Sequence, residues 1–261
     1  MRIAKRRWCL AAVVLVALMG LATVAQADEE PELPTVEEIE DHLDDLYRSE
    51  SSQAEMTMTI VTDRRGTREL TLEAWTKGSD DALFVIRAPA REAGTATLRT
   101  EEGLWNYAPR ADRLVRVPTG MLSDDWMGSH LSNDDLVQET GFRDDYETEL
   151  AWGERDGERV LMAVMTPREG APVVYDRVEY AMDAEHWTPL EALFYDDGEK
   201  VRTMTFSEVR EVDGRQVPHR MEVRPEDRPS ESTTLNYESL SFDVDIDESI
   251  FTRRGLRRIA R

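Results

Sequence analysis

The chain has 261 residues, a third of them charged, and a formal net charge of −22 at pH 7. This excess of acids argues against nucleic acid and anionic lipid surfaces as partners, because both carry negative charge. The sequence contains a single cysteine, Cys9, so no internal disulfide can form and a hydrophobic core must stabilise the fold.

The first 27 residues are predicted to be a cleaved signal peptide. Basic residues crowd the first seven positions, an apolar run follows over residues 9–24, and Ala25-Gln26-Ala27 matches a cleavage site. The apolar run is shorter than the ~20 residues that span a bilayer. We therefore expect an exported chain with a single domain over residues 28–261.

An amphipathic helix is predicted over residues 35–49. Thr35 and Glu38 have the spacing of a capping box, in which each side chain bonds the backbone of the other residue. Apolar residues then recur on one face of the helix: Val36, Ile39, Leu43 and Leu46.

Alternating apolar and polar residues predict strands through most of residues 56–117 and 146–246. Turn pairs such as Asp156-Gly157 and Asp213-Gly214 separate these runs, which indicates about eleven strands in an antiparallel meander. Such a sheet must protect its edges by closing into a barrel, folding into a sandwich or curling round a helix. We expect a mainly β domain with a curled sheet, because this arrangement has a place for every predicted strand and helical segment.

Residues 119–140 interrupt the strand pattern. Apolar residues recur there at roughly helical spacing among Ser, Asn, Asp and Gly: Met121, Leu122, Trp126, Met127, Leu131 and Leu136. A short apolar segment of this kind is either a plug that closes the sheet or a movable cover over a cavity. Asn133-Asp134 is interpreted as the N-cap of a short helix.

The basic tail at residues 252–261 contrasts with the acidic remainder of the chain. Its arginines are Arg253, Arg254, Arg257, Arg258 and Arg261. It is either a contact for an acidic partner or lipid headgroups, or a disordered end.

Catalytic and metal-binding motifs are missing from the sequence. The four histidines are far apart, and Asp243, Asp245 and Asp247 alternate with apolar residues as on a solvated strand face. Adjacent acid pairs such as Asp134-Asp135 point in different directions and lack a nucleophile–base partner. We expect no enzymatic activity, no cofactor and no metal.

The interior is expected to be rich in Met and aromatic residues, which adapt to variable apolar shapes. It is either an ordinary core or a cavity. The inward candidates are Met56, Met58, Trp75, Phe84, Ile86, Trp105, Tyr107, Met162, Tyr180, Phe194, Met204 and Met221.

Several short motifs, in order and over nearly the whole chain, resemble the outer-membrane lipoprotein-sorting proteins, the LolA-like family. They are GTATL at 94–98, LWNYAP at 104–109, RLVR at 113–116, WMGS at 126–129, NDDL at 133–136, YDDGEK at 195–200, DG at 213–214, VP at 217–218 and IFT at 250–252. The family pattern has an acidic residue after Gly128-Ser129, where this chain has His130.

The resemblance implies a half-open antiparallel β-barrel with a helical lid over an apolar cavity for acyl chains, in a monomeric periplasmic protein of a Gram-negative bacterium. It implies no enzymatic activity and no metal. The cavity and lid would be formed by Met56, Met58, Trp75, Phe84, Ile86, Trp105, Tyr107, Leu122, Trp126, Met127, Leu131 and Leu136. The lid motif would comprise Gly128, Ser129, His130, Asn133, Asp134 and Asp135.

Three functions follow as hypotheses. The first is a carrier that moves lipoproteins or other lipids between the inner and outer membranes. The second is an accessory subunit that docks on an RND-type inner-membrane exporter through its acidic surface or basic tail. The third is a hydrolase, which no motif in the sequence supports. If the segment is a lid, His130 predicts that cargo release depends on pH near about 6–7.

Overall fold

The computed structural model describes residues 31–138, 145–171 and 173–260. The chain divides into residues 1–31 and residues 32–261, and all described helices and strands belong to the second unit. The predicted signal peptide, residues 1–27, lies outside the described residues. None of the described helices is long and apolar enough to cross a bilayer.

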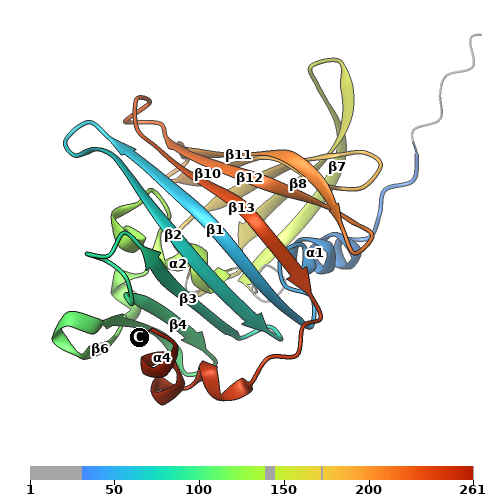
Figure 1. Cartoon of the computed structure of the whole chain (residues 1–261). Coiled ribbons are helices and arrows are strands. Elements are labelled where there is room, and N and C mark those ends of the chain that lie inside the picture. Colours follow the sequence, from blue (N-terminus) through green and yellow to red (C-terminus); the bar gives the residue numbers. More distant parts are fainter. Residues whose placement is uncertain (1–30, 139–144, 172, 261) are drawn as a thin grey trace, which may run out of the picture. The chain divides into compact units, whose positions relative to one another are not determined.

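A single antiparallel sheet of 13 strands forms the framework (Figure 1), in the order β6-β5-β4-β3-β2-β1-β13-β12-β11-β10-β9-β8-β7. The first group of strands is β1 (Ser51–Thr62), β2 (Gly66–Lys77), β3 (Asp81–Ala88), β4 (Ala96–Thr100), β5 (Gly103–Ala108) and β6 (Arg113–Arg116). The second group is β7 (Tyr146–Arg155), β8 (Glu158–Pro167), β9 (Arg177–Asp183), β10 (Pro189–Asp196), β11 (Glu199–Val212), β12 (Arg215–Pro225) and β13 (Ser232–Phe242).

The antiparallel meander predicted from the turns is confirmed, but the strand count of about eleven was low. Each segment between two turns pairs as a strand of its own, including the four residues of β6. The two groups join where β1 pairs with β13, so Met58 faces Leu235 across the join. The sheet is open rather than closed into a barrel, because β6 and β7 are its two edges.

The inner face of the sheet carries the main apolar cluster. Alternation along β1 and β2 places Met56, Met58, Leu70 and Leu72 on this face. Residues of the second group of strands, including Leu161, belong to the same cluster. The two groups of strands therefore share one core, which requires the sheet to curl.

The helix α1 (Val36–Asp45) packs on this core through Ile39, which is fully buried. The predicted capping box is present, since Thr35 and Glu38 bond reciprocally. The helix is shorter than the predicted 35–49, and the chain turns into β1 through Ser49, which adopts a positive φ of 55°.

A second apolar cluster lies on the outer face of β2–β5, under the C-terminal end of the chain. The short helix η4 (Glu248–Phe251) and the helix α4 (Arg253–Ile259) cover it with Phe251 and Leu256. Figure 1 shows α4 beside β4 and β6. The basic tail is thus an ordered helix up to Ala260 rather than a disordered end.

Candidate functional site

The segment between β6 and β7 must pass from one edge of the sheet to the other, because these consecutive strands are the two edges. We call residues 117–138 the crossing segment. It contains η2 (Thr119–Met121), η3 (Trp126–Gly128) and α2 (Asn133–Gln138). Residues 139–140 of the predicted insertion and the side chain of Asp134 lie outside the described residues.

The crossing segment is folded locally by its own polar residues. An isolated bridge joins Asp125 to Ser132, and the Trp126 backbone N–H donates to the Leu131 carbonyl at 2.7 Å. Ser132 caps α2, because its hydroxyl accepts from the Asp135 N–H and the Asp135 carboxylate accepts from the Ser132 N–H. The predicted cap at Asn133-Asp134 was thus one residue late. Asn133 instead donates to the carbonyl of Met121.

Trp126 anchors the crossing segment on the inner face of the sheet. Its side chain is 2% exposed, and its ring meets Phe84 edge-on with centroids 5.6 Å apart. The indole Nε1–H donates to the Thr97 hydroxyl at 2.9 Å, and that hydroxyl donates to Asn106 at 2.8 Å. The buried indole is thus fully satisfied, which fixes its position more precisely than apolar packing alone.

Two arginines of the sheet hold the crossing segment from opposite sides. Arg68 of β2 donates through Nη1 to the Met127 carbonyl at 2.8 Å and is paired with Glu92. Burial alone would raise the pKa of Glu92, but Arg68 outweighs it and the pKa is lowered. Glu92 therefore stays ionised and orients Arg68 toward the segment.

Arg202 of β11 holds the other side. It forms a bidentate pair with the Asp135 carboxylate, and its Nη1 also donates to the His130 carbonyl at 3.3 Å. The guanidinium lies over the rings of Phe194 and Tyr175, 4.0 and 4.6 Å from their centroids. Burial lowers the pKa of Arg202, but Asp135 more than offsets it, so the pKa is raised and the charge is kept.

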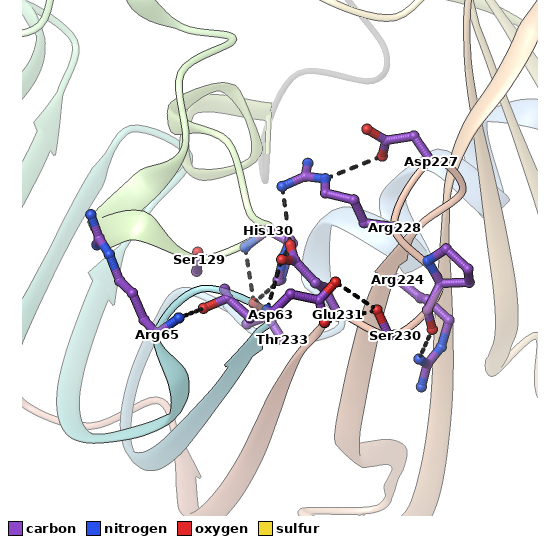
Figure 2. A network of polar contacts seen from close by, with 12 residues as sticks. Asp63, Arg65, Ser129, His130, Arg224, Asp227, Arg228, Ser230, Glu231 and Thr233 are labelled. Atoms are coloured by element: carbon purple, nitrogen blue, oxygen red, sulfur yellow. Dashed lines mark hydrogen bonds and ion pairs between the residues drawn. The ribbon is translucent and has the colours of Figure 1, made fainter.

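A polar network around Glu231 joins the crossing segment to two hairpins (Figure 2). The Glu231 carboxylate accepts from the Asp63 backbone N–H at 2.9 Å and lies 3.1 Å from both Nε2 of His130 and Nη1 of Arg228. The His130 backbone N–H donates to the Thr233 hydroxyl at 2.9 Å. The network therefore ties His130 to the β1–β2 and β12–β13 turns.

An apolar cavity of about 120 Å³ lies between the crossing segment, α1 and the inner face of the sheet. Its side chains come from both groups of strands, so the curl of the sheet creates it. They are Leu43, Asp44, Leu46, Tyr47, Arg48, Met56, Leu72, Phe84, Trp126, Leu131, Asp135, Leu136, Tyr180, Pro189, Phe194, Met204, Phe206, Met221, Leu235 and Tyr237.

Five of the residues predicted for the cavity and lid line this cavity: Met56, Phe84, Trp126, Leu131 and Leu136. Met58, Ile86 and Met127 belong to the same apolar cluster without lining the cavity. Leu122 is half-exposed at the start of the crossing segment. Within the predicted motif, Gly128 adopts a positive φ of 69°, and the Ser129 hydroxyl donates to the Trp126 carbonyl.

Three predicted cavity residues, Trp75, Trp105 and Tyr107, point the other way. Trp75 and Tyr107 belong to the outer cluster under α4, and Trp105 lies beneath the guanidinium of Arg253 from that helix. Ala74 precedes Trp75 and faces inward, so strand alternation turns Trp75 outward. Met162 is wrong for the same reason, because its neighbours Leu161 and Ala163 are the inward residues.

Arg68 and Arg202 were missed by the sequence analysis, although a signal for them exists. Arg202 shares its strand face with Met204, and Arg68 shares its face with Leu70. A charge in the inward position of a strand requires a buried partner. For Arg202 that partner is Asp135 of the crossing segment, whereas Arg68 pairs with Glu92 and donates to the Met127 carbonyl of the segment. Within the described residues, no group of three or more acidic, histidine or cysteine side chains is placed to hold a metal ion.

An open, curled antiparallel sheet with a helical segment crossing between its edges is a LolA-like fold. A family model described as "uncharacterized protein", DUF1329-like, matches residues 78–258. The match covers more than half of the chain, and the protein belongs to this family.

Three solved structures have the same fold. A domain described as an outer membrane lipoprotein-sorting protein, from Vibrio parahaemolyticus, is 23% identical with a TM-score of 0.74, covering 85% of this chain and 97% of the other. A DUF1329 family protein from Desulfovibrio piger is 23% identical with a TM-score of 0.76, covering 84% and 96%. A LolA superfamily protein from Nitrosomonas europaea is 22% identical with a TM-score of 0.72, covering 85% and 99%. No curated protein sequence matches the chain.

Proposed function

We propose that this protein is a periplasmic carrier that binds the acyl chains of lipoproteins or other lipids and moves them between the inner and outer membranes without catalysing a reaction. The observation that carries the proposal is the apolar cavity beneath a crossing segment that polar contacts hold at both sides. The lipoprotein-sorting description of the Vibrio parahaemolyticus structure supports the same function.

Binding of acyl chains in this cavity requires the crossing segment to act as a lid. At about 120 Å³ the cavity is close in size to one that holds a single benzene, for which ~150 Å³ suffices. A chain of a dozen methylenes needs more room, so Trp126, Leu131 and Leu136 must move away from the sheet. These side chains form part of the cavity wall when the lid is closed, and cargo takes their place when it opens.

The energetics allow this exchange. Burying a methylene contributes about 0.8 kcal/mol, so a dozen contribute on the order of 10 kcal/mol before the cost of ordering the chain. Displacing the lid exposes three apolar side chains and breaks the hydrogen bonds of Arg68 and Arg202. The gain from the cargo is large enough to offset a substantial part of that loss.

A disulfide between the lid and the sheet provides the test. Position 130 contacts position 233, and Cys9 can be replaced by serine to leave a cysteine-free background. The variant His130→Cys/Thr233→Cys should take up a fluorescent fatty acid when reduced and fail to do so when oxidised. Each single cysteine variant is the control for effects of the substitutions themselves. Equal uptake by the oxidised and reduced forms would show that the segment is not a lid.

Native mass spectrometry of the protein purified from its host identifies the cargo. We expect a population with the added mass of one lipid or lipopeptide, which disappears on delipidation. Protein that carries no lipid and also fails to take up the fluorescent fatty acid would contradict the carrier proposal.

The alternative proposal is a non-carrier subunit that docks on an RND-type inner-membrane exporter through the basic corner formed by α4. Arg254 is exposed there, and the guanidinium groups of Arg253 and of Arg116 of β6 each lie over the ring of Trp105, 5.0 and 5.9 Å from its centroid. Arg254→Glu should then reduce co-purification with the exporter without changing fatty acid uptake. Unchanged co-purification would remove α4 as the docking element.

A further inference from the structure

A polar pocket of about 450 Å³ lies beside the apolar cavity, across the pair formed by Arg202 and Asp135. The Asp135 side chain lines the apolar cavity, whereas Arg202 lines the polar pocket. The rings that flank the guanidinium divide in the same way, with Phe194 in the apolar cavity and Tyr175 in the polar pocket. The ion pair is therefore part of the wall between the two spaces.

Arg202 differs from the other cations of this pocket in its burial. Lys200 pairs with Glu226 at 2.9 Å, and all members of that pair and of the Arg228–Asp227 pair are at least 39% exposed. Such pairs contribute little and exchange readily with solvent or a ligand. Arg202 is 5% exposed, and its Nε has no hydrogen-bond partner among the described residues. A guanidinium has five N–H donors, so Arg202 retains the capacity to bind a further acceptor.

We propose that the polar pocket binds the anionic headgroup of an amphiphile whose acyl chain occupies the apolar cavity. A carboxylate or phosphodiester would accept two hydrogen bonds from Arg202 in place of Asp135, since the guanidinium fork matches both groups. Asp135 lies in the first turn of α2, where its carboxylate accepts from the Ser132 N–H, so losing its arginine releases that side of the lid. Headgroup binding and lid opening are thereby the same event.

The charge balance of the pocket limits the headgroup further. Its three cations face three acids that also line it, Asp125, Glu226 and Asp227, and two of the cations pair in addition with Asp135 and Glu231. Because the headgroup takes the place of the single Asp135 charge on Arg202, a headgroup with one negative charge adds fewer unmatched charges than a dianion. The inference rests on the proposed carrier function and narrows its cargo to singly charged amphiphiles, in preference to cargo whose lipid part is uncharged.

The experiment compares anionic probes with uncharged probes of matched chains on the same protein at neutral pH. Palmitate is compared with hexadecanol, and phosphatidylglycerol with diacylglycerol. The unmodified protein should bind the anionic member of at least one pair about tenfold more tightly or better, as expected for hydrogen bonds between charged groups. Which pair shows the preference distinguishes a carboxylate from a phosphodiester.

Two variants assign the preference to Arg202. Arg202→Gln should reduce the ratio of affinities to about one, whereas Asp135→Asn should keep or increase it, because the competing carboxylate is gone. Arg68→Gln is the matched control, because Arg68 also holds the lid but does not line the polar pocket. It should leave the ratio unchanged, and thermal unfolding of each variant verifies that it is folded.

Equal affinity of the unmodified protein for charged and uncharged probes would overturn the headgroup site while leaving the carrier proposal intact. A preference that survives Arg202→Gln would overturn the assignment to Arg202. Failure to bind any of the four probes would count against the carrier function itself.

Discussion

Charged side chains on the inner face of an apolar sheet explain how a segment without regular pairing is held in place. Arg68 and Arg202 each occupy a strand position that alternation directs toward the core. Burying a guanidinium is costly unless its charge and donors find partners. The crossing segment supplies the Asp135 carboxylate to Arg202 and the Met127 carbonyl to Arg68, whose charge is matched by Glu92. These residues therefore fix the position of the segment on the sheet.

Glu231 makes the stability of this arrangement depend on pH. Hydrogen bonds from the Asp63 backbone and His130, together with Arg228, hold the pKa of Glu231 below its ordinary value of 4.5. A lowered pKa in the folded state means that the carboxylate stabilises the fold above about pH 4.5 and loses this effect as pH falls through the folded-state pKa. Urea unfolding between about pH 6 and 3 should therefore show a smaller decline in stability for Glu231→Gln than for the unmodified protein.

The control for this prediction is Glu158→Gln, an exposed residue at the start of β8. It should follow the unmodified protein. Parallel declines for all three proteins would show that Glu231 does not contribute. The dependence of cargo release on His130 near neutral pH stays a prediction.

At the scale of elements, separate side-chain contacts hold the crossing segment on the sheet. Trp126 is the largest buried side chain among them. Trp126→Ala should destabilise the closed segment by about 3–5 kcal/mol, because it removes a buried ring and leaves the Thr97 hydroxyl without its donor. Hydrogen exchange should accelerate in residues 126–136 more than in β1 and β2. Trp126→Phe, which keeps most of the ring, should show a smaller effect. Uniform acceleration across the sheet would mean that the segment does not open independently.

The C-terminal helix α4 is a structural element as well as a basic one. Leu256 is fully buried on the outer cluster, and a Cβ on Gly255 would lie 1.8 Å from the Ser249 carbonyl oxygen. Leu256→Ala should therefore lower the free energy of unfolding by about 2–5 kcal/mol in urea titrations. Arg254→Ala, an exposed change in the same helix, should alter it by less than about 0.5 kcal/mol. Similar values for the two variants would contradict the packing of α4 on the sheet.

This packing also changes how the docking alternative is tested. Deleting residues 253–261 would remove Leu256 and Ala260 from the outer cluster, so lost binding could reflect unfolding rather than lost charge. Substituting the exposed Arg254 separates the two effects.

For the whole molecule, the proposed carrier function implies that cargo stabilises the folded state. A ligand that binds only the folded protein adds about 2.7 kcal/mol of stability at a hundred times its Kd. For a domain of this size that corresponds to an increase in Tm of roughly 5–10 °C. Differential scanning calorimetry with and without fatty acid measures it. The oxidised disulfide variant should show no increase, and an equal increase there would place the lipid outside the cavity.

Much of the fold followed from local patterns. The meander was predicted from turn residues, and α1 from the capping box of Thr35 and Glu38, because short-range geometry determines both. The site was predicted only in part. Trp75 and Tyr107 look like core residues in the sequence, and the sequence pattern alone does not show that α4 covers the outer face and gives them a second core.

The sequence by itself determined the strands, the turns, the first helix and the apolar character of the segment between the two groups of strands, since each depends on neighbours along the chain. The tertiary structure alone decided that β1 pairs with β13 and leaves β6 and β7 at opposite edges. That pairing joins residues about 180 positions apart, as with Met58 and Leu235. It makes residues 117–138 cross the sheet. It also places Arg202 beside Asp135, a contact that the spacing of these residues along the chain does not predict.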